Sequence, residues 1–202
     1  MVNLVSPNDF RPSPGPSVVN LSNSLTVLRI VAIPFILILM QADTPQSGLW
    51  ATGVFIAAFI TDWLDGFIAR KKNQVTRFGK MLDPLADKLL IGSGLIMLIS
   101  LDRVPAWIVI LIISREIAVT WLRASLAGKG FILSADRWGK NKTFFQAVAL
   151  IPLIIYYPYF GVDLHLVGLG LLWIALALTV WSGLHYFFRY YPMLMRGNGK
   201  ST

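Results

Sequence analysis

The sequence contains no cysteine among its 202 residues and only two histidines, His165 and His185. The lack of cysteine excludes disulfide bonds, thiolate nucleophiles, and zinc or iron–sulfur sites held by cysteine. Charged residues are scarce, because Asp, Glu, Lys and Arg together make up 14% of the chain, whereas hydrophobic residues make up 55%. A mean hydropathy of +0.64 is far from that of an ordinary soluble domain. The sequence therefore predicts an integral membrane protein.

Apolar stretches follow one another along most of the chain. Each is about 20 residues long, which suffices for a helix rising 1.5 Å per residue to cross the ~30 Å hydrocarbon core of a bilayer. We therefore expect an all-α, polytopic membrane protein with six transmembrane helices. Their approximate ranges are 23–40, 49–70, 81–101, 104–126, 143–157 and 164–188.

Proline and charge divide the remaining chain. Residues 1–19 contain four prolines and little apolar periodicity, and they lack the basic start and apolar run of a secretory signal, so a flexible tail is expected there. The six-helix domain is expected over residues 20–192, and a cytoplasmic tail over residues 193–202. No second domain or internal repeat is evident.

The net charge of +8 comes from basic residues in particular connections. Lysines and arginines gather after the second and fourth apolar stretches and in the C-terminal tail, whereas segments 41–48 and 158–164 have none and the turn at 102–103 has just Arg103. By the positive-inside rule, both termini and the two basic connections face the cytoplasm. The basic charge is therefore mainly topological, and we expect no nucleic-acid partner.

Four aspartates lie where the second and third apolar stretches are joined. Asp62 and Asp65 are three residues apart, and Asp83 and Asp87 are four apart, so each pair shares one face of a helix. Two antiparallel helices bring the pairs to the same depth, near the headgroups. Oxygen ligands without histidine or cysteine suit Mg²⁺ or Mn²⁺, and two such ions ~3.5–4 Å apart are suited to displacement at phosphorus. A divalent-metal site is therefore predicted.

The alternative is that these aspartates cap helix starts or pair with nearby basic residues. Asp83, which precedes Pro84, is a plausible N-cap of the third helix. However, unpaired carboxylates cost ~2.5 kcal/mol or more each at the centre of a membrane helix, and they repel one another. A compensating cation is the better explanation.

Small residues complete a longer pattern around the aspartates. The segment reads D-x-x-D-G-x-x-A-R, eight residues, then G-x-x-x-D-x-x-x-D. This pattern resembles the signature of the CDP-alcohol phosphotransferase family, which comprises six-helix membrane enzymes. These enzymes move a phosphatidyl or related group from a CDP-linked donor to an alcohol and release CMP. The matching residues are Asp62, Asp65, Gly66, Ala69, Arg70, Gly79, Asp83 and Asp87.

The resemblance implies roles for these residues. The four aspartates are expected to hold two divalent ions, Mg²⁺ or Mn²⁺, and Asp87 is also the expected general base. The residues expected to bind the CDP-linked donor are Asp62, Gly66, Ala69, Arg70 and Gly79. The family also suggests a homodimer.

Further stretches resemble the bacterial members of the family that use glycerol 3-phosphate. These are "NSLTVLRIVAIP" at 23–34, "SREIAVTWLR" at 114–123 and "GKNKTFFQ" at 139–146. The resemblance implies transfer of a phosphatidyl group from CDP-diacylglycerol to glycerol 3-phosphate. It also implies a location in the bacterial cytoplasmic membrane, with the active site facing the cytoplasm.

A dianionic acceptor needs fixed cations close to the metal site. The residues expected to bind its phosphate are Arg115, Arg123, Lys140 and Lys142, and those that could line the same cavity are Asn23, Thr26, Arg29 and Thr143. Alternatively, Arg115 and Glu116 form an internal ion pair that locks helices together. Adjacent residues point about 100° apart on a helix, so Glu116 is not expected to neutralise Arg115 directly.

Two further functions fit parts of the sequence. A related enzyme could use serine, inositol phosphate or phosphatidylglycerol as acceptor, although the expected cationic pocket disfavours serine. A divalent-cation transporter with six spans could also carry intramembrane acids. A transporter would be expected to carry ionisable groups across the membrane depth, whereas these aspartates gather at one rim.

Overall fold

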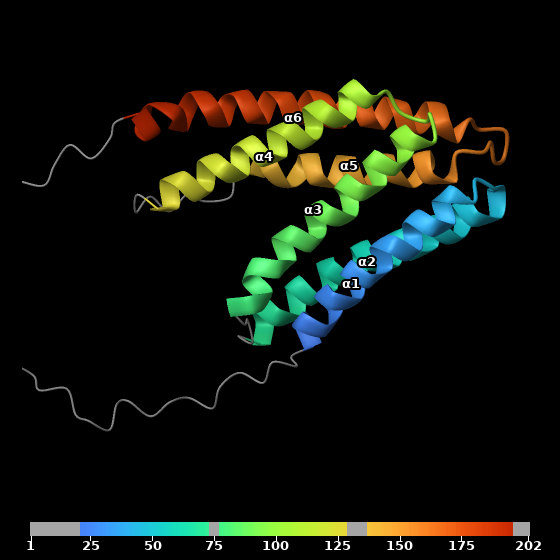
Figure 1. Ribbon diagram of the computed structural model, residues 1–202, viewed down its shortest axis with the longest axis horizontal. Coiled ribbons are helices and arrows are strands. Elements are labelled where there is room, and N and C mark those ends of the chain that lie inside the picture. The colour runs from blue at the N-terminus through green and yellow to red at the C-terminus, as the bar shows by residue number, and fades with distance from the viewer. Residues whose placement is uncertain (1–20, 73–76, 129–136, 196–202) are drawn as a thin grey trace, which may run out of the picture.

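In the part of the chain that the computed structural model describes, long apolar runs form six helices, as predicted (Figure 1). The structure describes residues 21–72, 77–128 and 137–195, and it describes the side chains of residues 27–61, 85–126 and 142–191. No strand occurs within these ranges. The helices are α1 (Leu21–Gln41), α2 (Pro45–Lys72), α3 (Arg77–Ser100), α4 (Ala106–Gly128), α5 (Arg137–Ile155) and α6 (Leu164–Met195).

Several helices extend beyond the apolar stretches that predicted them. Helix α3 begins at Arg77 rather than near residue 81, α5 begins at Arg137 rather than 143, and α6 continues to Met195 rather than 188. The alternative N-cap role of Asp83 is therefore wrong, because this residue lies inside α3. Hydropathy marks only the apolar part of a helix, and in α3 and α5 basic residues with good helix propensity continue the helix into a more polar region.

Neighbouring helices alternate in direction and form two groups. Helices α1 and α2 pack together, α4 and α5 both pack against α6, and contacts between α2 and α5 join the groups. Helix α3 runs diagonally between them and contacts α1, α4 and α5 (Figure 1). The core between the helices is built from large aliphatic and aromatic side chains that are almost fully buried, among them Met40, Phe55, Leu95, Leu150 and Leu172.

The connections alternate between two ends of the helices (Figure 1). The α1–α2, α3–α4 and α5–α6 connections lie at one end, here called the loop end, whereas the ends of α2, α4 and α6 lie at the other. The latter is called the basic end, because the basic residues of the sequence gather there. The N-terminal segment 1–19 lies outside the described residues, as does the chain beyond Met195.

Helices α5 and α6 approach closely at one glycine. A Cβ atom added to Gly168 would lie 2.6 Å from Cγ of Leu153, which is too close for a real contact. Gly170, two residues further along α6, has no such neighbour within 4 Å. The absence of a side chain at residue 168 therefore permits the close packing of these two helices.

At the loop end, Arg103 connects three separate parts of the chain. Its side chain is 3% exposed and forms an ion pair with Asp43, while its NH1 group donates hydrogen bonds to the carbonyl oxygens of Leu153, at 3.1 Å, and Ile154, at 2.8 Å. These carbonyls belong to the last turn of α5, where a cation is favourable. The guanidinium also lies 4.2 Å from the ring centroid of Tyr156. The guanidinium of Arg103 therefore binds groups inside the protein.

One described segment, Leu164–Tyr191 of α6, is long and apolar enough by itself to cross a membrane. Shorter apolar helices cover Val27–Gln41 and Lys142–Ile155. Large hydrophobic side chains also point outward, including Trp50, Trp121 and Trp181, which are 70%, 60% and 67% exposed. An outer surface of this kind is unusual for a water-soluble protein.

Candidate functional site

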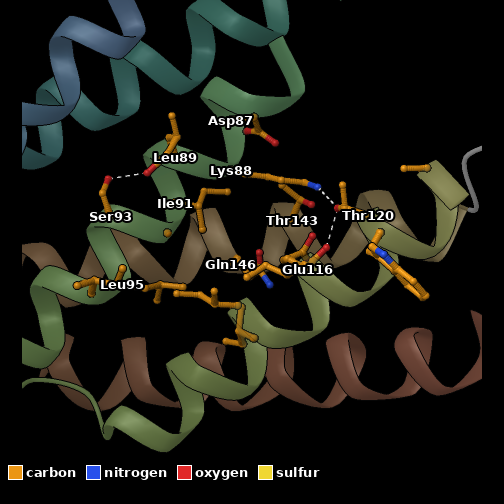
Figure 2. Close-up of a pocket in the computed structure, with 17 residues that line it drawn as sticks. Asp87, Lys88, Leu89, Ile91, Ser93, Leu95, Glu116, Thr120, Thr143 and Gln146 are labelled. Atoms are coloured by element: carbon orange, nitrogen blue, oxygen red, sulfur yellow. Dashed lines mark hydrogen bonds between the residues drawn. The ribbon is translucent and has the colours of Figure 1, made fainter. Parts of the chain in front are cut away.

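A cavity of about 610 Å³ lies between α3, α4 and the first half of α5 (Figure 2). Most of its lining surface is apolar, but polar side chains from all three helices gather toward one part of it. A cavity with a large apolar surface and a few convergent polar groups is typical of a ligand site. The polar residues are Asp87, Lys88, Ser93, Glu116, Thr120, Thr143 and Gln146.

Helical periodicity explains which side chains reach the cavity. On α3, Asp87, Ile91 and Leu95 are spaced four apart and line it from one face. On α4, Glu116 and Thr120 are also four apart. The sequence therefore places one carboxylate of the aspartate motif and the glutamate of the fourth helix on helix faces that meet across the cavity.

The structure describes only one of the four aspartate side chains. Asp87 is half-buried and lines the cavity. Asp62, Asp65 and Asp83 lie on α2 and α3, but their side chains are outside the described residues, as are those of the remaining residues expected to bind the donor, Gly66, Ala69, Arg70 and Gly79. Among the described side chains, no three His, Asp or Glu residues gather as a metal site.

Behind the cavity wall, Glu116 joins two of the expected acceptor cations. Its Oε1 atom accepts a hydrogen bond from Nζ of Lys142 and lies 3.3 Å from NH1 of Arg115. The expectation that Glu116 does not neutralise Arg115 directly is therefore wrong. Adjacent Cα–Cβ bonds do diverge on a helix, but the long arginine side chain reaches back to its neighbour.

The same arginine packs closely against α6. Its NH2 group donates a hydrogen bond to Oγ of Ser182 at 2.9 Å. A Cβ atom added to Gly183 would lie 2.8 Å from Cγ of Arg115. Gly183 therefore leaves the space in which the stem of Arg115 lies, a constraint that the sequence alone did not suggest.

Arg123 occupies a matching position one turn of α6 further along. Its Nε donates to the hydroxyl of Tyr186 at 3.0 Å, and its guanidinium lies 4.9 Å from the centroid of that ring. Arg115 and Arg123 thus face the same helix, as their spacing of eight residues suggests. Neither residue, nor Lys142, lines the cavity itself. The side chain of Lys140 is outside the described residues.

The residues expected to line a cavity have different positions. Thr143 lines it, together with Asp87 and Glu116. Arg29 is buried, at 4% exposure, but is not among the lining residues. The side chains of Asn23 and Thr26 lie outside the described residues.

The structure also adds polar residues that the sequence did not single out. Lys88 donates a hydrogen bond to the hydroxyl of Thr120, which in turn donates to the carbonyl oxygen of Glu116 at 2.6 Å (Figure 2). Nε2 of Gln146 donates to Oγ1 of Thr179 at 3.2 Å in a buried pair. A possible signal was the spacing of Gln146, four residues after Lys142 on the same helix.

Comparison with known proteins gives consistent results. Residues 19–181 match the family model of CDP-alcohol phosphatidyltransferases. The chain is 44% identical over 192 residues to the CDP-diacylglycerol--glycerol-3-phosphate 3-phosphatidyltransferase of Bacillus subtilis (strain 168), covering 89% of this chain and 99% of that protein. It is 41% identical over 172 residues to a probable phosphatidylglycerophosphate synthase of Mycobacterium tuberculosis (strain ATCC 25618 / H37Rv), covering 84% and 80%. A Haemophilus influenzae protein with the same name as the Bacillus relative is 37% identical over 172 residues, covering 83% and 91%.

Proposed function

The chain belongs to the CDP-alcohol phosphatidyltransferase family, and we propose that it transfers the phosphatidyl group of CDP-diacylglycerol to glycerol 3-phosphate. The products are phosphatidylglycerophosphate and CMP. The observation that carries the proposal is the similarity along nearly the whole length of a relative named for this reaction, at 44% identity. The cavity supports it, because Asp87 of the family motif lines this cavity together with Glu116, and Glu116 in turn contacts Lys142.

Divalent metal ions are part of the proposal, with Mg²⁺ or Mn²⁺ as the ions and two as their number. The family is in general metal-dependent. Asp62, Asp65, Asp83 and Asp87 would hold the ions, and such ions supply positive charge that stabilises a pyrophosphate and its leaving group. The four aspartates fit this role, because carboxylate oxygens are the ligands that these hard cations prefer. All four residues lie near the join between α2 and α3.

The chain's own residues then have the following roles. Asp87 takes the proton from the primary hydroxyl of glycerol 3-phosphate, and that oxygen bonds to the lipid-side phosphorus of the donor. The bond from this phosphorus to the oxygen of the CMP phosphate breaks, and CMP leaves. Gly66, Ala69, Arg70 and Gly79 bind the CDP part of the donor together with Asp62.

The phosphate of the acceptor is proposed to bind to a separate set of cations. These are Arg115, Arg123, Lys140 and Lys142, and Thr143 lines the cavity beside them. The contact of Lys142 with Glu116 supports this assignment, because Glu116 lines the same cavity as Asp87. Arginine and lysine are the usual partners of a phosphate dianion.

The proposed setting is a bacterial cytoplasmic membrane that all six helices cross, with both termini and the cavity on the cytoplasmic side. The apolar outer surface and the membrane-length segment of α6 support a membrane location. The gathering of basic residues at one end of the helices supports the orientation. A homodimer is also proposed, by likeness to the family.

The test is a screen of acceptors with purified protein and CDP-diacylglycerol, scored by release of CMP. We expect release with glycerol 3-phosphate and little with serine, inositol phosphate or phosphatidylglycerol. EDTA should abolish release, and added Mg²⁺ or Mn²⁺ should restore it. If the protein prefers another acceptor, its activity is that of a related phosphotransferase instead. Metal uptake into vesicles without CMP release under any condition would indicate a transporter.

A further inference from the structure

Glu116 lines the cavity and also bonds two cations that do not line it. On the cavity side it lies among the same lining residues as Asp87 and Thr143 (Figure 2). On the other side, its Oε1 atom accepts a hydrogen bond from Lys142 and lies 3.3 Å from NH1 of Arg115. One carboxylate therefore connects the proposed site of proton transfer with the proposed phosphate-binding cations.

Arg115, Lys142 and Glu116 bring together two positive charges and one negative charge, and all three side chains are largely shielded from solvent. The side chains of Arg115, Glu116 and Lys142 are 12%, 21% and 6% exposed. Two neighbouring cations at such burial repel each other, and burial of each is costly unless an anion compensates it. Glu116 offsets one of the two charges, which leaves one positive charge for an incoming anion.

We infer that Glu116 is a positioning residue for the acceptor: its carboxylate holds Lys142 beside Arg115, directly behind the residues that line the cavity, and from there the two cations bind the phosphate of glycerol 3-phosphate. This inference rests on the proposed function. Glu116 takes no part in bond making or breaking. Without its charge, Lys142 is repelled by Arg115, and its flexible four-carbon stem turns the amine away from the wall. Acceptor binding then weakens, whereas donor binding, which uses other residues, does not.

A purely structural role for Glu116 gives a different expectation. The bond from Lys142 also ties α5 to α4, and the bond from Arg115 to Ser182 ties α4 to α6. If the carboxylate served only to lock these helices, its loss would loosen the whole site. Both Michaelis constants would then rise together, and the melting temperature would fall.

The experiment measures CMP release by Glu116→Gln, which keeps the size of the side chain and removes its charge. We expect the KM for glycerol 3-phosphate to rise roughly tenfold, which is within the range of measured couplings between contacting residues. The KM for CDP-diacylglycerol and kcat at saturating acceptor should stay within about twofold. Glu116→Asp, which keeps the charge on a shorter stem, should raise the KM for glycerol 3-phosphate by less. If Glu116→Gln does not fold, Glu116→Asp takes its place in every comparison.

Two further variants sharpen the result. Asp102→Asn makes the same acid-to-amide change at an exposed position at the loop end, and it should alter neither KM. In a Lys142→Met background, Glu116→Gln should add little to the KM for glycerol 3-phosphate, because the residue acts through that lysine. Additive effects, equal rises in both constants, an unchanged KM or a lower KM for glycerol 3-phosphate would each overturn the inference. Absence of CMP release by the unaltered protein would instead overturn the proposed function.

Discussion

Replacing Arg103 by Met tests whether the buried contacts at the loop end stabilise the whole helix arrangement. Methionine has a similar length but no charge and no donor, so it keeps much of the packing while removing the polar contacts. The guanidinium donates to the carbonyl oxygens of Leu153 and Ile154 and pairs with Asp43. After the substitution, the last turn of α5 loses a cation and two hydrogen bonds, and its carbonyl groups stay buried beside an apolar side chain.

The magnitude follows from these contacts. Hydrogen bonds from a charged donor contribute about 1.5–3 kcal/mol each, and the two to α5 share one NH1 group, so they are not fully additive. The ion pair adds no more than about 1 kcal/mol, because the Asp43 side chain is 51% exposed. We therefore expect Arg103→Met to lower the free energy of unfolding by about 3–5 kcal/mol. For a chain of this size, that corresponds to a melting temperature lower by roughly 6–20 °C.

The assay is thermal unfolding of the detergent-solubilised protein at one fixed heating rate, with CMP release measured well below the transition. Asp43→Asn is the matched control, because it removes the exposed partner's charge but leaves the hydrogen bonds to α5. It should cost no more than about 1 kcal/mol. CMP release by Arg103→Met should equal that of the unaltered protein at low temperature, because Arg103 is not among the residues that line the cavity. An unchanged melting temperature for Arg103→Met, or an equal loss for Asp43→Asn, would refute the reasoning.

Further substitutions test the site and the helix packing. Asp87→Asn should lower kcat for CMP release by at least about 100-fold, because an amide cannot take up the hydroxyl proton; full turnover would exclude Asp87 as the base. Gly168→Ala should lower the free energy of unfolding by about 1–3 kcal/mol in thermal or denaturant unfolding, because the added methyl group overfills the contact between α5 and α6. Its control, Gly170→Ala in open space, should be neutral or stabilise the helix by up to about 1 kcal/mol, and equal effects of the two would contradict the packing argument. Gly183→Ala should raise the KM for glycerol 3-phosphate severalfold but leave that for CDP-diacylglycerol unchanged, because the methyl group displaces the stem of Arg115; unchanged kinetics would argue against a role of Arg115 in acceptor binding.

Helix number and order were predictable because they depend on local properties. Runs of about 20 apolar residues separated by short polar segments specify helices of membrane length almost independently of the rest of the chain. The predicted boundaries were less accurate at the basic end, as in α3 and α5, because basic residues favour a helix without adding hydropathy. The spacing of Asp83 and Asp87 likewise placed both on one face of a helix before any tertiary contact was known.

Contacts between distant residues were not predictable in this way. Glu116 and Lys142 are 26 residues apart, and Arg103 and Leu153 are 50 apart. Nothing in the local sequence of either partner distinguishes a lysine that pairs inside the protein from one that anchors a helix at the membrane surface. For the same reason Arg103 could only be counted as a loop charge, although it is buried beneath Tyr156.

The sequence by itself determined that the described parts of the chain form helices, with an acidic motif at one join and basic residues at the same end, because helix periodicity and hydropathy are properties of neighbouring residues. Only the tertiary structure decided that Glu116 connects the cavity to Lys142, that Gly183 makes room for Arg115, and that one arginine closes the loop end. Side-chain reach and helix packing set these contacts, and both depend on how helices far apart in the chain meet in space.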